Sequence, residues 1–314
     1  MRLVFAGTPE VAVPSLQALL ESGHEILAVV TRPDAAAGRG KRLRPSPVRE
    51  VAEAAGIEVL TPATPSEPEF VSRMRDLAPD AAPVVAFGGL IPPEVLSIPT
   101  HGWVNLHFSL LPAWRGAAPV QQAIIAGDTV TGASTFLLEE GLDTGPVIDT
   151  LTTQIGEHET SGELLERLAQ EGAALLVSCL DAIEAGTATP VPQPEEGVSY
   201  ATKLSHEDAR LDWSVSAIDL DRRARGCTPT PGAWTLFRGV RLRVGQMQVA
   251  APGAVEIPEG AEPGRLVVSK RSVHVVTGDG VVELQRVQPA GKKMMVASDW
   301  ARGVRIEDGE LVGR

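Results

Sequence analysis

Apolar positions recur with two different spacings along the first 188 residues of the chain. Short apolar runs typical of buried strands, such as residues 2–7 and 102–107, alternate with segments of helical spacing, such as residues 15–23 and 161–186. Glycine closes several helical segments, and Ser161 is expected to cap the longest one. Strands that alternate with helices of this length predict an α/β fold with a mostly parallel sheet and helices on both faces.

The pattern changes after residue 188. Residues 189–204 are rich in proline and polar side chains and predict a linker. A helix is expected over residues 214–226, and the short apolar runs with glycine turns that follow it are typical of a small β-barrel or sandwich. We therefore expect two domains, residues 1–188 and 205–314, in keeping with a length of 314 residues.

The composition is that of a globular protein, with 43% hydrophobic and 22% charged residues. No apolar run reaches the roughly 18 residues of a membrane span, and the first residues lack a signal-peptide pattern, so we expect a cytoplasmic protein. The net charge of −12 argues against a nucleic-acid partner unless basic side chains gather on one surface.

Spacing argues against two kinds of site. Gly7 ends the first strand, but the residues after it do not supply the G-x-G-x-x-G that cradles a dinucleotide pyrophosphate. Cys179 and Cys227 lack zinc spacing, no His, Asp and Glu set has metal-ligand spacing, and no metal is expected. Both cysteines are expected to be structural, and any ligand is expected at the carboxyl ends of the strands.

Asn105 and His107 lie two residues apart at the end of one predicted strand, just before the turn "SLLP". Residues two apart on a strand share a face, so an amide and an imidazole would lie side by side. Such a pair can donate hydrogen bonds to a developing oxyanion. The alternative is that both residues merely cap the strand.

A second segment, "GLDTG", places Asp143 in a glycine-flanked loop after another strand. A carboxylate beside an imidazole orients it, raises its basicity and can pass protons through a water molecule. Taken alone, "GLDTG" is a common turn and favours a solvated loop aspartate; together with Asn105 and His107 it supplies a group that can handle protons. No serine or cysteine occupies a nucleophile elbow, which leaves direct transfer between two bound substrates.

The segment "NLHFSLLPAWRGAAP" together with "GLDTG" resembles the folate-dependent formyltransferases. The segments "FAGTPEVAVPSL", "RPDAAAGRGKRLRPSPV", "YATKLSHEDARLDW" and "VQPAGKKMM" resemble the branch of that family that acts on methionyl-tRNA. The resemblance covers nearly the whole chain. It implies a Rossmann-like catalytic domain, a C-terminal OB-like barrel that binds tRNA, 10-formyltetrahydrofolate as co-substrate and initiator methionyl-tRNA as acceptor.

The resemblance also implies roles for individual residues. Asn105 and His107 would polarise the formyl carbonyl, and Asp143 would set the state of His107 and assist proton transfer. The folate site would be formed by Phe87, Gly88, Leu90, Ser109, Leu110, Leu111, Pro112, Glu139 and Glu140. The chain departs from the pattern at Phe108, where many relatives carry glycine, and at Phe87, where tyrosine is frequent.

Basic residues gather in two places despite the acidic total. A long loop between Arg32 and Arg49 carries Arg39, Lys41, Arg42 and Arg44, and in the resembled family this insertion enters the acceptor-stem end of the tRNA. Arg241 and Arg243 would share one face of the C-terminal barrel, as in barrels that bind nucleic acid. A solvated, flexible basic loop is the alternative for the first cluster.

Three other functions stay open at this point. The acceptor could be another amine, such as a sugar nucleotide or glycinamide ribonucleotide, because the catalytic residues would be the same. Water could be the nucleophile, which would make the protein a formyl-folate hydrolase. A non-catalytic RNA-binding protein is disfavoured by the intact Asn105, His107 and Asp143. No obligate protein partner is evident.

Overall fold

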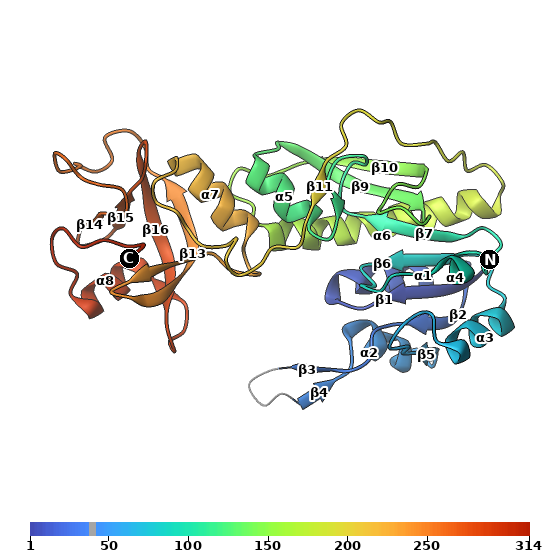
Figure 1. Cartoon of the computed structure of the whole chain (residues 1–314). Helices are drawn as coiled ribbons and strands as arrows, with labels where there is room; N and C mark the ends of the chain where they lie inside the picture. The colour runs from blue at the N-terminus through green and yellow to red at the C-terminus, as the bar shows by residue number, and fades with distance from the viewer. Residues whose placement is uncertain (38–41) are drawn as a thin grey trace. The chain divides into compact units, whose positions relative to one another are not determined.

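The computed structural model describes residues 1–37 and 42–314, and the chain divides into two compact units (Figure 1). Unit 1 comprises Met1–Pro119, Val130–Gln154 and Leu165–Tyr200. Unit 2 comprises Val120–Thr129, Ile155–Leu164 and Ala201–Arg314. The units therefore interleave along the chain, whereas the sequence pattern suggested consecutive domains.

Unit 1 is built on a seven-stranded sheet in the order β10-β9-β7-β6-β1-β2-β5. The strands are β1 (Arg2–Gly7), β2 (Glu25–Val30), β5 (Glu58–Leu60), β6 (Ala82–Val85), β7 (Trp103–His107), β9 (Val130–Leu137) and β10 (Val147–Gln154). The first five pair in parallel, whereas β9 runs antiparallel to both β7 and β10. The prediction of a mostly parallel sheet is confirmed, with an antiparallel pair at one edge.

Helices pack on this sheet because its strands alternate buried side chains between two faces. Val4 and Val84 pack on one face with Phe70 and Met74 of α3, and Leu106 meets Gly172 of α6 on the other. The helices of the N-terminal two thirds are α1 (Val13–Leu20), α2 (Pro47–Ala54), α3 (Pro68–Leu77), α4 (Pro93–Leu96), α5 (Pro119–Ala126) and α6 (Ser161–Glu184), after a short 3₁₀ turn η1 (Glu10–Ala12).

Two local expectations change. The capping residue of α6 is Thr160, not Ser161, because Thr160 and Glu163 exchange hydrogen bonds in a capping box while Ser161 Oγ donates to the carbonyl of Thr228. The basic loop contains a hairpin, in which β3 (Ala35–Ala37) pairs antiparallel with β4 (Arg42–Arg44).

Unit 2 is an antiparallel sheet in the order β12-β13-β16-β15-β14, with β17 also paired to β16. Its elements are α7 (Ala217–Gly226), β12 (Trp234–Phe237), β13 (Val240–Val249), β14 (Leu266–Val268), β15 (Val273–Val276), β16 (Val281–Pro289), β17 (Met295–Val296) and α8 (Ala297–Val304). Val312 bridges to Phe237 at the end of β12, and Leu311 bridges to Arg265 beside β14. These bridges join the two edges of the curled sheet, and the predicted small barrel is confirmed.

The two early segments of unit 2 pack against α7. A cavity of about 270 Å³ lies there, lined by residues 127–129, residues 155–158 and α7. In its wall, Arg225 Nε donates to the buried carboxylate of Asp221 at 2.7 Å, and Arg225 Nη1 donates to the carbonyl of Glu159 at 3.2 Å. The charged groups of this cavity thus join α7 to the segment that begins at Ile155.

No helix in the described part of the chain is both long and apolar enough to cross a lipid bilayer.

Candidate active site

Asn105 and His107 are the third and the last residue of β7, an interior strand of the unit 1 sheet. Leu106 between them is buried against α6, so the two polar side chains share the opposite face as predicted. His107 is buried at 7% exposure, whereas Asn105 is partly exposed. In the part of the chain that the structure describes, the Asn105 amide makes no side-chain hydrogen bond, so it remains available to a ligand.

The imidazole of His107 lies between two groups from different segments. Its Nε2 lies 2.9 Å from the backbone carbonyl of Trp114, and its Nδ1 lies 3.8 Å from Oδ2 of Asp143. A carbonyl oxygen only accepts, so the hydrogen bond places a proton on Nε2. In the neutral ring Nδ1 is then the nitrogen with a lone pair, and it faces the aspartate.

Burial is the largest influence on the protonation of His107. It lowers the pKa of the imidazole below the ordinary value of 6.5, while the charge of Asp143 and the hydrogen bond to Trp114 act in the opposite direction. The ring is therefore neutral near pH 7, with its proton on Nε2.

Asp143 lies in the loop between β9 and β10 in a left-handed backbone conformation, with φ of 52°. Its Oδ2 accepts a 2.7 Å hydrogen bond from the backbone N–H of Gly116, which directs the carboxylate toward His107. Asp tolerates this conformation better than most residues, at a cost of about 1 kcal/mol. Gly145 is required for a different reason, because a Cβ there would lie 1.8 Å from the carbonyl oxygen of Leu137.

The "SLLP" turn after β7 is held by a buried serine of the neighbouring strand. Ser134 Oγ on β9 donates to the carbonyl of Ser109 at 2.7 Å and accepts from the N–H of Leu111 at 3.1 Å. Ser109 Oγ in turn donates to the carbonyl of Ala113 at 2.6 Å. Leu110, Leu111 and Pro112 stay half-buried at the surface of this fixed turn.

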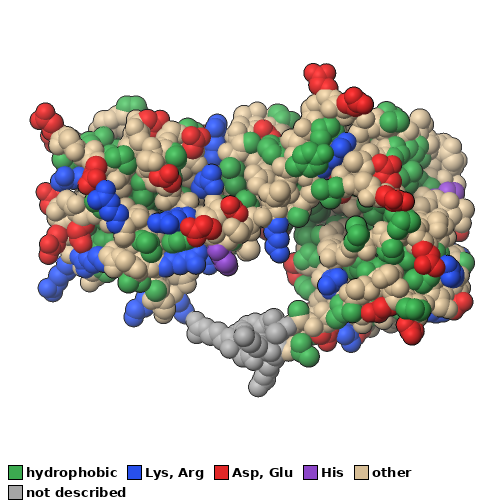
Figure 2. All heavy atoms as spheres, in the orientation of Figure 1, with side chains coloured by type: hydrophobic (Ala, Val, Ile, Leu, Met, Phe, Trp, Pro, Cys, Tyr) green, Lys and Arg blue, Asp and Glu red, His purple; other side chains and the backbone are tan. Residues whose placement is uncertain are grey.

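The other residues predicted to bind folate lie in two loops at the same edge of the sheet. Phe87 is buried in the core and its carbonyl accepts from Thr8 Oγ1, so its side chain packs rather than faces solvent. Leu90, in contrast, is 86% exposed just after Gly88. Glu139 and Glu140 are exposed in the Asp143 loop, where Glu139 accepts from Thr144. Figure 2 shows a hollow with hydrophobic side chains on the drawn face of unit 1.

Three residues that the sequence reasoning did not select complete this site. Arg115 is buried and donates through Nε and Nη2 to Gln193 Oε1, at 3.0 and 2.6 Å. Gln193 Nε2 donates to the carbonyls of Asp143 and Gly145, both at 2.8 Å. Ser199 Oγ accepts from the N–H of Trp114 at 2.9 Å. Two of these residues lie in the segment that composition alone marked as a linker, and no sequence signal distinguishes them there.

The basic residues of the hairpin are described only in part. Arg39 and Lys41 lie outside the described residues. Arg42 and Arg44 belong to β4, and Arg44 is exposed.

On the barrel, Arg241 and Arg243 share a face of β13, because Leu242 between them is buried. The guanidinium of Arg241 lies 4.3 Å from the ring centroid of Trp234, and that of Arg210 lies 5.6 Å from the same ring. Arg243 instead donates to the carbonyl of Pro229 at 2.7 Å. Figure 2 shows further Lys and Arg side chains on the drawn face of unit 2.

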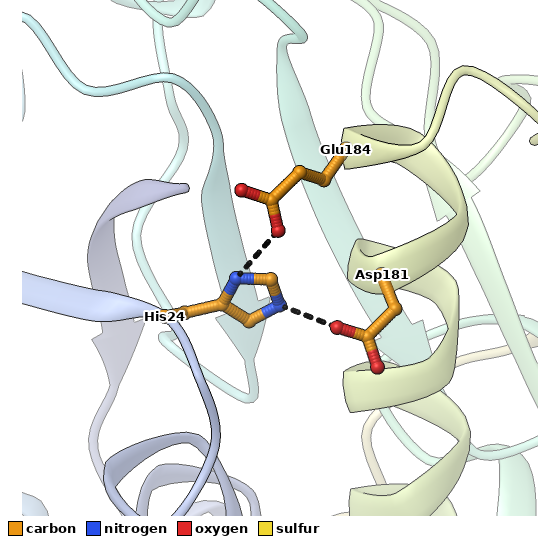
Figure 3. Close-up of side chains that lie close together, drawn as sticks. All are labelled: His24, Asp181 and Glu184. Carbon is orange, nitrogen blue, oxygen red and sulfur yellow. Dashed lines mark ion pairs between the residues drawn. The ribbon is translucent and has the colours of Figure 1, made fainter.

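One cluster in the described residues offers three side chains of metal-ligating type, His24, Asp181 and Glu184. Figure 3 shows the imidazole between the two carboxylates, which lie against different ring nitrogens. Nε2 is 3.3 Å from Asp181 Oδ1, and Nδ1 is 3.6 Å from Glu184 Oε2. A metal ion takes one nitrogen of an imidazole, so this arrangement fits a set of ion pairs between β2 and α6 better than a metal centre.

Comparisons with known proteins show the family of the chain. A sequence profile described as "Formyl transferase" matches residues 1–180, and one described as "Formyl transferase, C-terminal domain" matches residues 203–305. In structure, the chain resembles WlaRD, a sugar 3N-formyl transferase solved in the presence of dTDP and 5-N-formyl-THF, with a TM-score of 0.68 and 15% identity over 93% of this chain and 99% of that one. The profile matches show that the chain belongs to the formyl transferases, enzymes that transfer a formyl group, and the structural likeness shows that it shares their fold.

Much closer relatives refine the class. The chain is 60% identical to a methionyl-tRNA formyltransferase of Streptomyces coelicolor over the full length of both proteins. It is 59% identical to one of Thermobifida fusca, over 100% of this chain and 99% of the relative. The chain belongs to the methionyl-tRNA formyltransferase family, and the resemblance noted in its motifs is confirmed.

Proposed function

We propose that the protein transfers the formyl group of 10-formyltetrahydrofolate to the α-amino group of initiator methionyl-tRNA, giving N-formylmethionyl-tRNA for translation initiation. The amine nitrogen attacks the formyl carbon and loses a proton. The bond from that carbon to N10 of the folate then breaks, and N10 gains a proton. No covalent enzyme intermediate is required, in keeping with a site that contains an amide, an imidazole and a carboxylate.

The observation that carries the proposal is the convergence of His107 and Asp143, from two distant segments, beside Asn105 at the end of a central strand. The Asn105 amide can donate to the formyl oxygen as negative charge develops on it. A preorganised donor of this kind lowers a barrier by roughly 3 to 4 kcal/mol in acyl-transfer enzymes.

The state of His107 suggests how the proton moves. Because Nε2 is engaged by Trp114, only Nδ1 can face the reacting atoms, and in the neutral ring Nδ1 is an acceptor. We propose that a proton from the attacking amine reaches Nδ1 with the help of Asp143, so that the imidazole becomes a donor as the oxyanion forms. The α-amino group has an ordinary pKa of about 7.7 to 8.0, so only modest help is needed to keep it neutral.

The folate is proposed to lie along the loops that carry Gly88 and Leu90, the turn from Ser109 to Pro112, and Glu139 and Glu140. Exposed Leu90 supplies apolar surface for a pterin ring. The backbone groups of the "SLLP" turn, fixed by Ser134, supply the hydrogen bonds that orient it.

The tRNA is proposed to contact Arg39, Lys41, Arg42 and Arg44 in the basic segment between Arg32 and Arg49, and Arg241 and Arg243 on the barrel. This binding is proposed to take place in the cytoplasm, where charged tRNA is found. Arg241 stacked on Trp234, with Arg210 on the same ring, presents fixed positive charge of the kind that binds a nucleic-acid backbone. Since Arg243 already donates to Pro229, its share is expected to be the smaller.

The test is transfer of labelled formyl from 10-formyltetrahydrofolate to charged initiator tRNA, with elongator methionyl-tRNA as the control. We expect formylmethionyl-tRNA to form in a reaction that needs both substrates and prefers the initiator. Release of free formate without an amine would identify a hydrolase instead. Formylation of an amino sugar nucleotide, with none of the tRNA, would identify another acceptor.

A further inference from the structure

The segment from Val191 to Ser199 belongs to unit 1 and is hydrogen-bonded along that unit at three places. Val191 and Val147 exchange backbone hydrogen bonds of 2.8 Å in both directions. Ser199 accepts from Trp114 through its hydroxyl and from Arg115 through its carbonyl, both at 2.9 Å. Between these ends, Gln193 turns its side chain toward the Asp143 loop.

The side-chain amide of Gln193 uses all of its hydrogen-bonding capacity. Its oxygen accepts twice from the buried guanidinium of Arg115, and its NH₂ group donates to the carbonyls of Asp143 and Gly145. A guanidinium only donates and carbonyls only accept, so the orientation of the amide is fixed by chemistry and cannot be reversed.

These bonds determine where the Asp143 carboxylate lies. Asp143 is held in a left-handed conformation by bonds at both of its ends, from Gln193 at its carbonyl and from Gly116 at its carboxylate. Gly116 and Arg115 follow directly on Trp114, whose carbonyl fixes the ring of His107. The two groups that face each other across 3.8 Å are therefore set by one network in which Gln193 is the shared member.

We propose that Gln193 is a positioning residue of the transfer reaction, which acts on the geometry of Asp143 relative to His107 without touching either substrate. The proposal rests on the proposed function of this site. A shift of about 1 Å in a reacting group can reduce turnover by roughly a hundredfold, so loss of the Gln193 bonds should lower kcat. Substrate KM values should stay near those of the wild type, because no binding group is removed.

The network has two halves, the bonds from Arg115 to the Gln193 oxygen and the bonds from the Gln193 NH₂ group to the two loop carbonyls. The variant Gln193→Glu tests them separately. A carboxylate keeps, and strengthens, the bonds to Arg115, but it cannot donate to the carbonyls of Asp143 and Gly145. Gln193→Ala removes both halves. Glu195→Gln, an exposed change in the same segment, is the matched control.

The experiment measures kcat, both KM values, the unfolding temperature and hydrogen exchange of residues 138–146 by mass spectrometry. For Gln193→Glu we expect a thermal midpoint like the wild type, a kcat lower by about 10- to 100-fold, KM values within threefold and faster exchange in the loop. Gln193→Ala should do the same with some loss of stability, and Glu195→Gln should change nothing.

A Gln193→Glu enzyme that keeps full kcat and normal loop exchange would overturn the proposal. So would one in which kcat and thermal stability fall together, since Gln193 would then be only structural, or one in which KM alone rises. Because the exchange measurement needs no substrate, it judges the positioning of Asp143 even if the wild type fails to formylate tRNA, which would count against the proposed function alone.

Discussion

The two units place their polar side chains in opposite ways. In unit 1, His107 and Arg115 are buried and Asp143 is half-buried, and each is held by hydrogen bonds of its own unit. In unit 2, Arg241 is exposed, and its guanidinium lies over the ring of Trp234. Unit 1 is thus organised before a substrate arrives, whereas unit 2 presents charge that a large partner can use.

This difference implies different sensitivities to change. A buried, fully bonded site loses function when one atom moves, but it is little affected by salt because its charges are shielded from ions. On an exposed basic face, each side chain adds a separate contribution to the affinity for nucleic acid, and these contributions weaken as salt rises. The following experiments test that contrast, in order of expected effect.

The largest effect is expected from His107→Ala. Removing the imidazole takes away the group that we propose to accept the amine proton and to donate a hydrogen bond to the oxyanion. We expect kcat to fall by roughly 100- to 1,000-fold, or about 3 to 4 kcal/mol of barrier. Rapid-mixing measurements of single turnovers would give the loss, and filter binding would show tRNA affinity unchanged. Turnover within a few-fold of the wild type would mean that His107 has no chemical role.

Arg241→Ala tests the exposed face. We expect tRNA to bind about 3- to 30-fold more weakly, with a salt slope reduced by about 1 and no change in the KM for folate. Trp234→Leu, which removes the ring under the guanidinium, should act in the same direction more weakly. Arg302→Ala, whose guanidinium is already paired with Asp299, is the matched control. Equal effects of Arg241 and Arg302 would show that only total charge matters.

The pH dependence probes the buried site alone. Because burial lowers the pKa of His107, the neutral ring should persist below pH 6.5 and the acid limb of kcat/KM should lie below that value. The same shift makes the folded state bind fewer protons than the unfolded one below about pH 6.5, so stability is lost as pH falls from that value through the lower pKa of the folded state. Ring ¹⁵N spectra should show the proton on Nε2, and Asp143→Asn should lower the midpoint further. A midpoint above 6.5 would mean that Asp143 outweighs burial.

The smallest effects are expected at the two buried cysteines, one in each unit. Burial raises the pKa of Cys179 in unit 1, and of Cys227 in unit 2, to about 11. Neither thiol should react with iodoacetamide at pH 8 in the native protein, and both should react at once after unfolding. With rising urea, labelling of each cysteine reports its own unit. Because the units interleave along the chain, we expect one common midpoint, and two well-separated midpoints would contradict that.

Much of the fold follows from local pattern. The five parallel strands and the helices α1, α2 and α3 were predictable because each buried strand is a short apolar run and each of these helices has its own spacing and stop signal. The single turn of α4 has no such pattern. The hairpin β3–β4 was not predictable, because each of its strands has only three residues, "AAA" and "RLR", which is too short to establish a strand period. The bridges of Leu311 to Arg265 and of Val312 to Phe237 join residues 46 and 75 positions apart along the chain, which no local pattern reports.

The site divides in the same manner. Residue type and spacing were enough to propose Asn105, His107 and Asp143 as catalytic residues, and their roles stay predictions until they are tested. Gln193 and Ser199 could not be found in this way, because a glutamine in a proline-rich segment looks like any solvated side chain. What gives Gln193 significance is a buried arginine and two carbonyls, and these come together only in three dimensions.

The interleaving of the units bears on how such an enzyme could be recombined. A cut within residues 189–204 would separate α7 from Val120–Thr129 and Ile155–Leu164, the two segments that pack beside it. The barrel could then not be exchanged between relatives as one continuous segment. A chimaera joined at that point would pack α7 of one relative against the two early segments of the other. A working exchange would have to carry all three pieces together.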